Sequence, residues 1–185
     1  MVLLETPVCE FGKHAIDFKL PGIDGKRWAL SECKGENGLL VMFICNHCPY
    51  VKSIQDRLVR DTNELADIGI NSVAIMSNDP ADYEEDTFEN MKLSAKQYGY
   101  QFPYLIDTTQ EIAMAYGAVC TPDFFGYNSD LELQFRGRLD ASGMQAVPNA
   151  KRELFEAMRQ IAKTGKGPLA QIPSMGCSIK WKTSL

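Results

Sequence analysis

Hydrophobic and polar positions along the chain fall into blocks that predict strands and helices in alternation. The run Leu39–Ile44 is short and continuously apolar, which is typical of a strand buried on both faces of a sheet. Ser72–Met76 has the same character. Between them, apolar residues recur at helical spacing from about Pro49 to Asp67, so we expect one amphipathic helix there.

Turn signals and apolar stripes place the remaining elements. Ile16–Leu20 and Arg27–Leu30 flank two turn signals and predict an N-terminal hairpin. In chain order we then expect a helix with its apolar stripe at Phe88–Tyr98, a strand at Pro103–Ile106, a helix at Thr109–Tyr116, strands at Asp123–Tyr127 and Leu131–Arg138, and a helix from Asn149 to Thr164. The tail from Lys166 is rich in proline and glycine and is expected to lie extended over the surface. These elements predict an α/β fold, a small mixed sheet with helices on both faces.

Size and composition narrow the class of protein. The 185 residues, with 45% hydrophobic and 23% charged, predict one domain over residues 1–185, with residues 166–185 as its tail. The net charge of −5 and the lack of a basic cluster argue against nucleic acid or a membrane as partner. No apolar run is long enough to cross a bilayer, and Met1–Phe18 lacks the pattern of a signal peptide, so we expect a cytoplasmic protein.

The segment Cys45-Asn46-His47-Cys48-Pro49 follows directly on the predicted strand. Two cysteines where a strand ends and a helix begins are placed to form thiolates, because free N–H groups and the helix dipole favour negative charge. We expect Cys45 to be the more exposed and more acidic thiol, which attacks a disulfide, and Cys48 to resolve the mixed disulfide. His47, between them, is expected to stabilise the Cys45 thiolate.

Other roles for the cysteines remain open. A Cys-x-x-Cys is also half of a zinc site, but the chain has no second close pair, and we expect no metal. Cys177 in the tail is either a resolving thiol that folds back onto the pair or a cysteine in a segment anchored by Ile179 and Trp181. Cys9 and Cys33 belong to no motif and are expected to be ordinary residues.

A proline directly before a predicted strand, in Cys120-Thr121-Pro122, indicates a cis peptide bond. Together with the Cys-x-x-Cys corner, it resembles the thioredoxin superfamily. The segments Phe102–Asp107 and Ala115–Val119 resemble its peroxiredoxin branch, and the likeness covers about residues 14–164. The resemblance implies a thioredoxin-like fold in which Thr121 and Pro122 position the substrate. It also implies that Cys120 lies close to the active-site sulfurs.

The segments Cys45–Lys52 and Gly176–Lys182 are similar to a group of uncharacterised peroxiredoxin-like proteins of the AhpC/TSA, redoxin type. Peroxiredoxins have a Pro-x-x-x-Thr-x-x-Cys motif, and aligning its cysteine with Cys48 puts Cys45 in place of the threonine and Val41 in place of the proline. No arginine stands near Thr121 in the sequence, where a second peroxide-binding group is expected.

We therefore expect an oxidoreductase that cycles Cys45 and Cys48 between dithiol and disulfide. The alternatives are an antioxidant thiol peroxidase, and a non-catalytic metal-holding or thiol-binding module that uses Cys45, Cys48 and Cys120. Expected partners are protein or small-molecule disulfides and thiols, or peroxides. No cofactor is expected, because another thiol supplies the electrons. Cys120 and Cys177 are the candidate accessory thiols.

Overall fold

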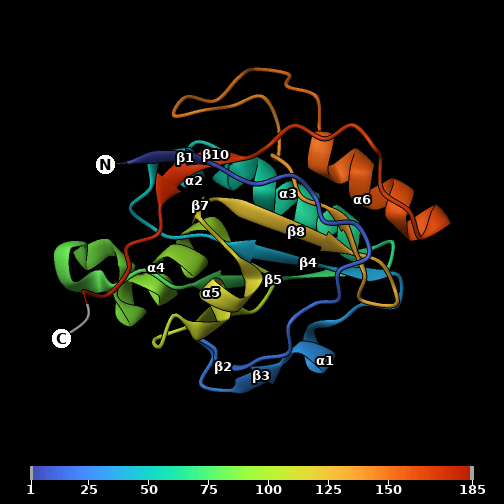
Figure 1. The fold of residues 1–185 in the computed structure, drawn as a ribbon. Coiled ribbons are helices and arrows are strands. Elements are labelled where there is room, and N and C mark those ends of the chain that lie inside the picture. The colour runs from blue at the N-terminus through green and yellow to red at the C-terminus, as the bar shows by residue number, and fades with distance from the viewer. Residues whose placement is uncertain (1, 184–185) are drawn as a thin grey trace.

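A five-stranded mixed sheet forms the centre of the structure, a computed structural model that describes residues 2–183 (Figure 1). Its strands are β4 (Gly38–Phe43), β5 (Ile70–Met76), β6 (Tyr104–Ile106), β8 (Asp123–Tyr127) and β9 (Leu133–Phe135). They lie in the order β6-β5-β4-β8-β9. The first three are parallel to one another, and β8 and β9 run antiparallel to their neighbours. The predicted α/β fold with a mixed sheet is confirmed.

Helices cover both faces of this sheet. They are α1 (Leu30–Cys33), α2 (Pro49–Lys52), α3 (Gln55–Ala66), α4 (Phe88–Tyr98), α5 (Glu111–Tyr116) and α6 (Glu153–Thr164), with short turns η1 (Pro80–Asp82) and η2 (Glu84–Asp86). Leu40 and Met42 of β4 pack in one apolar cluster with α3, α4 and α6. Leu39 and Val41 point to the other face, where α1 and α5 pack. None of the helices within residues 2–183 is long and apolar enough to span a membrane.

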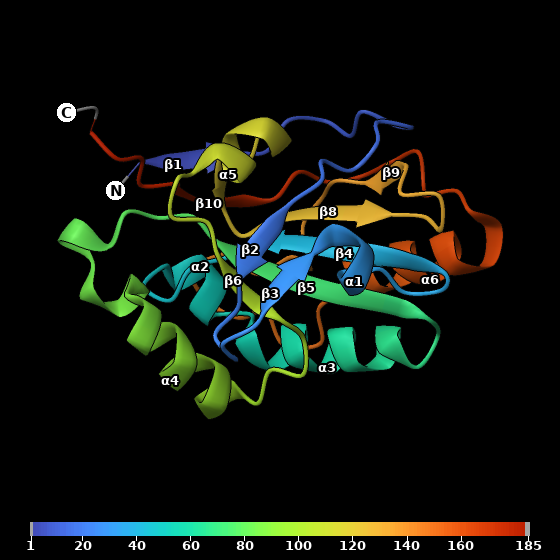
Figure 2. The ribbon, with the colours of Figure 1, turned by 90° about the horizontal axis from the view of Figure 1, so that it is seen from below.

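The predicted N-terminal hairpin is present as β2 (Lys19–Pro21) and β3 (Arg27–Ala29), which pair antiparallel. Figure 2 shows this hairpin and α1 across one face of the sheet. Gly25, in the turn between the two strands, has a positive φ of 82°, a conformation that glycine adopts without strain. Leu20 and Trp28 of the hairpin pack against the apolar cluster that contains Leu39 and Val41. The hairpin thereby covers one face of β4.

Three predicted elements have different bounds. The helix expected over Pro49–Asp67 is two helices, because the chain leaves the helix at Ser53–Ile54. There the Ser53 hydroxyl donates to the Tyr50 and Gly143 carbonyls (3.0 and 2.6 Å). The last helix begins at Glu153 rather than Asn149, whose φ of 56° is left-handed. The strand expected over 131–138 is shortened to β9, since Leu131 also has a positive φ.

The C-terminal tail is extended, as predicted, and residues such as Leu169 and Trp181 are exposed, but its segment around β10 is buried in the structure. Its strand β10 (Met175–Ser178) is the middle strand of a second sheet, between β1 (Leu3–Glu5) and β7 (Cys120–Thr121). Figure 1 shows β1 and β10, from opposite ends of the chain, side by side near α2. Gly176 and Cys177 are buried because the backbone of β10 packs closely on Thr121. The absence of a Cβ on Gly176 permits this approach.

Candidate active site

The two cysteines of the motif meet the predicted cis-proline segment beyond the end of β4. The Thr121–Pro122 bond is cis, as the sequence predicts. Cys45 Sγ lies 3.1 Å from the Thr121 hydroxyl oxygen. Cys48 Sγ lies 3.1 Å from the Thr121 carbonyl oxygen, to which its protonated thiol donates. The fold therefore brings Cys45, Cys48, Thr121 and Pro122 together, although Cys48 and Thr121 are 73 positions apart in the chain.

A third sulfur completes this cluster. Cys177 Sγ lies 2.8 Å from Cys48 Sγ, because β10 pairs antiparallel with β7 and sets Cys177 opposite Thr121. Cys120 is also buried, and its thiol donates a long hydrogen bond to the Pro122 carbonyl (3.7 Å). The tail thus places the Cys177 sulfur against Cys48. The thiol of Cys120, which precedes Thr121 in the sequence, contacts the Pro122 carbonyl of the same segment instead.

The pKa values of the three thiols are shifted in different directions. Hydrogen bonds from the Cys177 and Cys45 thiols lower the pKa of Cys48. Burial, followed by the hydrogen bond to Cys48, raises the pKa of Cys45, and the bond to Cys48 together with burial raises that of Cys177. The expectation that Cys45 is the exposed and more acidic thiol is wrong. Cys45 is only 1% exposed and faces the Asp86 carboxylate charge, whereas Cys48 is stabilised as thiolate by two donors.

His47 is bound to a carboxylate that the sequence analysis missed. Its Nδ1 lies 2.6 Å from Oδ2 of Asp86, and its ring stacks on Tyr83 with 3.9 Å between the ring centroids. A ring nitrogen of His47, the Cys45 sulfur and an Asp86 oxygen all lie within 4.8 Å of one another. His47 is therefore beside Cys45, as its predicted role as a tuning residue requires, but the Asp86 charge opposes the effect of a cationic ring on that thiol.

Asp86 organises the loop that carries the two cysteines. It is fully buried and accepts hydrogen bonds from the backbone N–H groups of Asn46 (2.8 Å) and His47 (3.2 Å) and from the Asn78 amide (2.8 Å). Burial by itself would raise the pKa of Asp86, but the hydrogen bonds from His47 and Asn78 outweigh it and lower the pKa. In the sequence Asp86 ends the run Glu84-Glu85-Asp86, in which nothing distinguishes it from two exposed acids.

Among the described residues, Cys45, His47 and Asp86 form the one group of three side chains whose ligand atoms are close enough together to hold a metal ion. Both Asp86 oxygens already accept hydrogen bonds, from the loop backbone, His47 and Asn78. This arrangement favours a structural carboxylate over a ligand. The metal-holding set considered from the sequence, Cys45, Cys48 and Cys120, is not among the close groups of ligand side chains found within residues 2–183.

An arginine does lie near the cis-proline segment, and it comes from the end of β9. Arg136 Nη2 lies 2.9 Å from Oδ2 of Asp123, and both side chains are buried. Burial raises the pKa of Asp123 to about 6, even though the Arg136 charge lowers it. The guanidinium also donates to the Gly117 carbonyl and lies 4.4 Å above the Phe125 ring. These contacts make Arg136 a counter-ion of β8.

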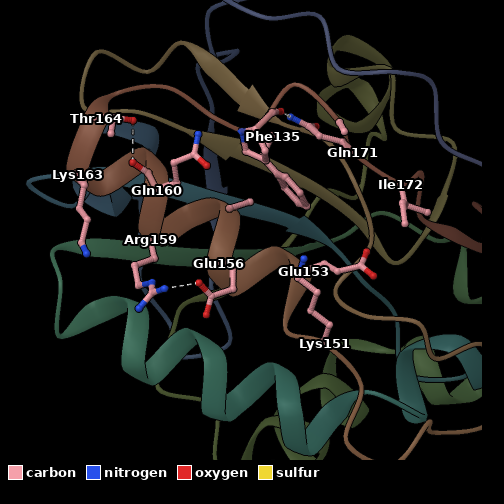
Figure 3. Close-up of a pocket in the computed structure, with 13 residues that line it drawn as sticks. Phe135, Lys151, Glu153, Glu156, Arg159, Gln160, Lys163, Thr164, Gln171 and Ile172 are labelled. Atoms are coloured by element: carbon pink, nitrogen blue, oxygen red, sulfur yellow. Dashed lines mark hydrogen bonds and ion pairs between the residues drawn. The ribbon is translucent and has the colours of Figure 1, made fainter.

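Two hollows differ in their relation to the thiols. One of about 210 Å³ adjoins the cis-proline and is bounded by Tyr50, Pro122, Ser142 and Met175 among others, so it is the nearest approach to the site. A second, of about 620 Å³, lies along α6 (Figure 3). Its wall carries charged side chains such as Glu156 and Arg159, which form an ion pair, and it does not reach the cis-proline segment; no cysteine lines either hollow. We therefore treat the first as the entrance to the candidate active site.

A mixed sheet with helices on both faces, and a Cys-x-x-Cys corner against a cis-proline segment, define a protein of the thioredoxin-like fold. The family model of the AhpC/TSA family matches residues 11–141, and the chain belongs to that family. No curated protein sequence matches the chain.

Solved structures agree with this assignment. An uncharacterised conserved protein from Geobacillus kaustophilus is 44% identical, with a TM-score of 0.94 over 100% of this chain and 99% of its own. A hypothetical protein from Sinorhizobium meliloti 1021 is 38% identical, with a TM-score of 0.90 over 97% and 99%. A thiol:disulfide interchange protein of the thioredoxin family from Chlorobium tepidum TLS is 20% identical, with a TM-score of 0.62 over 82% and 97%, and shares the fold.

Proposed function

We propose that the protein is a thiol–disulfide oxidoreductase that cycles Cys45 and Cys48 between dithiol and disulfide. The observation that carries this proposal is that both cysteines of the motif contact Thr121 of the cis-proline segment, Cys45 at its hydroxyl group and Cys48 at its carbonyl oxygen (3.1 Å each). Two sulfurs held against one residue, three positions apart at the start of α2, are placed to form a disulfide bond. The pKa is lowered at Cys48 and raised at Cys45, so Cys48 is the thiol of the pair that ionises first and Cys45 is the one that keeps its proton.

The reaction balances with thiols alone. A thiolate of the pair attacks one sulfur of a substrate disulfide, a mixed disulfide forms, and the other substrate sulfur leaves as thiolate and takes a proton. The second cysteine then loses its proton and attacks its partner's sulfur. The Cys45–Cys48 bond forms, the mixed disulfide breaks, and the substrate departs as a dithiol. Two electrons have moved to the substrate, and a second thiol protein or small thiol restores the pair.

The surrounding residues have supporting roles in this proposal. Thr121 contacts the Cys45 sulfur through its hydroxyl group and the Cys48 sulfur through its carbonyl oxygen, so it orients both sulfurs. Pro122 lines the entrance hollow, where a substrate segment would lie. His47, in contact with Asp86, sets the charge beside Cys45. The partners we propose are protein or small-molecule disulfides and thiols, in the cytoplasm.

Disulfide mapping after reaction with a substrate tests the proposal. The reduced protein is treated with oxidised glutathione, quenched with acid, alkylated and mapped by mass spectrometry. We expect a Cys45–Cys48 bond as the first product, and we expect Cys48→Ser to abolish catalytic turnover of the disulfide and Cys45→Ser to lower it. Cys33→Ser, at a buried thiol in α1, is the matched control and should keep full activity. Undiminished turnover in both motif variants would reject the proposal.

A thiol peroxidase is the second candidate, because Cys48, at the peroxidatic position of the family motif, is the thiol with the lowered pKa. In that reaction the Cys48 thiolate attacks one peroxide oxygen, the O–O bond breaks, and the products are a sulfenic acid and, after protonation, water or an alcohol. A second thiol then condenses with the sulfenic acid and releases water. A rate constant with hydrogen peroxide far above that of a free thiolate would select this candidate, and a rate no faster would select disulfide exchange.

A further inference from the structure

The C-terminal strand β10 covers the thiol pair and brings its own thiol into contact with it. Cys45, Cys48 and Cys177 are each at most 1% exposed. The sulfurs of Cys48 and Cys177 are 2.8 Å apart, and a disulfide bond is about 2.05 Å long, so bond formation needs an approach of only about 0.8 Å. Cys48 contacts Cys177 directly and is the partner of Cys45 in the proposed function, so it is the common partner of two alternative bonds.

Contacts on both sides of Cys177 hold this sulfur in place. The strand register sets Cys177 opposite Thr121 and Ser178 opposite Cys120. Further along, the Ile179 N–H donates to the Val119 carbonyl (3.2 Å). The Lys180 N–H donates to Oδ1 of Asn78 (2.9 Å). The position of Cys177 thus depends on backbone pairing that exists without any sulfur–sulfur bond.

The same groups support the loop that carries the Cys45 and Cys48 pair. Asn78 accepts from Lys180 of the tail and donates to Asp86, which in turn binds the backbone of the cysteine loop. The Tyr83 ring stacks on His47 and lies 5.5 Å from the Lys180 ammonium group. Tail and loop are therefore fastened to one buried hydrogen-bond network, which fixes the distance between Cys48 and Cys177.

We propose that Cys177 is a third redox thiol, which exchanges with the Cys45–Cys48 disulfide; this inference rests on the proposed function. Cys177 gives up its proton and its sulfur attacks Cys48 Sγ. The Cys48–Cys177 bond forms, the Cys45–Cys48 bond breaks, and Cys45 leaves as thiolate and takes up a proton. One disulfide is present before and after, so the step needs no oxidant or reductant. Its result is a free Cys45 thiol and a tail tied covalently to the site.

A time course of disulfide mapping tests this step. The reduced wild-type protein receives one equivalent of oxidised glutathione, and samples are quenched with acid, alkylated and mapped by mass spectrometry. We expect the Cys45–Cys48 bond first and the Cys48–Cys177 bond after it. Cys45→Ser should form Cys48–Cys177 directly, and the matched control Cys120→Ser, at a buried thiol of β7, should form both bonds as the wild type does. Adding Asn78→Ala to Cys45→Ser should slow that bond about fivefold, because Lys180 loses one hydrogen-bond acceptor.

The outcomes separate this inference from the function on which it rests. If Cys45–Cys48 forms but Cys48–Cys177 appears neither in the wild type nor in Cys45→Ser, the inference is overturned and the proposed function stands. If the wild type forms Cys48–Cys177 and never Cys45–Cys48, the proposed function is overturned together with the exchange step. Because the wild-type time course needs no substitution, a variant that fails to fold does not affect the decision.

Discussion

The buried carboxylate of Asp86 offers a quantitative test of how the cysteine loop is held. Asp86→Asn keeps the size of the side chain but replaces one acceptor oxygen with a donating NH2 group. In the wild type, Oδ1 accepts from the N–H groups of Asn46 and His47, and Oδ2 accepts from His47 Nδ1 and Asn78. Whichever way the amide turns, two donors then face each other in a buried place.

The expected loss follows from the number of bonds affected. A hydrogen bond to a charged group contributes about 1.5–3 kcal/mol, and the substitution removes the charge and breaks at least one such bond, so we expect the free energy of unfolding to fall by about 2–3 kcal/mol. Urea denaturation at neutral pH measures it. Asp82→Asn, an exposed acid of η1, is the matched control and should change stability by less than about 0.5 kcal/mol.

The pH dependence gives a second reading of the same residue. The pKa of Asp86 is lower in the folded protein than the ordinary value of 3.8, so the unfolded chain binds the proton more readily. This contribution to stability is fully present above the unfolded pKa and is lost as the pH falls through the folded pKa. Wild type and Asp86→Asn should therefore converge in stability at acid pH. A neutral-pH loss below about 0.5 kcal/mol, within the range of surface substitutions, would refute the reasoning.

Three further substitutions probe the tail, the buried ion pair and the thiolate. Gly176→Ala puts a Cβ against the Thr121 carbonyl, so β10 should separate from β7 more often. Overpacking costs about 1–3 kcal/mol, and the thiols of this variant should react with Ellman's reagent about tenfold faster or more. Gly143→Ala, whose Cβ has only ordinary contact to Tyr50, is the control and should react at the wild-type rate. Equal rates in the two variants would contradict the close packing of β10 on β7. Arg136→Met leaves the Asp123 carboxylate buried without its counter-ion and should lower the unfolding free energy by about 3–5 kcal/mol; a loss under 1 kcal/mol in thermal denaturation would disagree. Cys48→Ser should remove the thiolate absorbance at about 240 nm in mildly acidic solution, because Cys48 carries the lowered pKa, whereas retention of that absorbance would assign the charge to another cysteine.

Local patterns in the sequence were sufficient for the central sheet and for part of the site. Gly38 to Phe43 form β4 because a run of six buried positions has no polar face to expose. Cys45 and Cys48 are placed by their distance from that strand, and the Thr121–Pro122 bond by its proline. In each case the signal and the feature lie within a few residues of each other.

The features that the sequence left open or did not indicate depend on contacts between distant segments. Cys177 is 129 positions from Cys48, and its place against that sulfur is set by pairing of β10 with β7, which no local periodicity encodes. Gly176 looks like a turn residue but serves as the point of closest approach between two strands. Asp86 differs from its acidic neighbours only by what surrounds it after folding. The acidity of the thiols was reversed for the same reason, since the donors to Cys48 include a residue of the tail.

The position of β10 between β1 and β7 determines how the thiols can become accessible. A middle strand is bonded along both edges, so it does not leave alone without breaking both sets of pairs. Three residue pairs join it to β1, and two join it to β7. On the β7 side Ile179 also donates to the Val119 carbonyl and Lys180 to the Asn78 side chain, so the seam over the sulfurs extends beyond these two pairs. Exposure of the thiols therefore requires the loss of contacts between segments from both ends of the chain, because β1 helps to hold β10 in place.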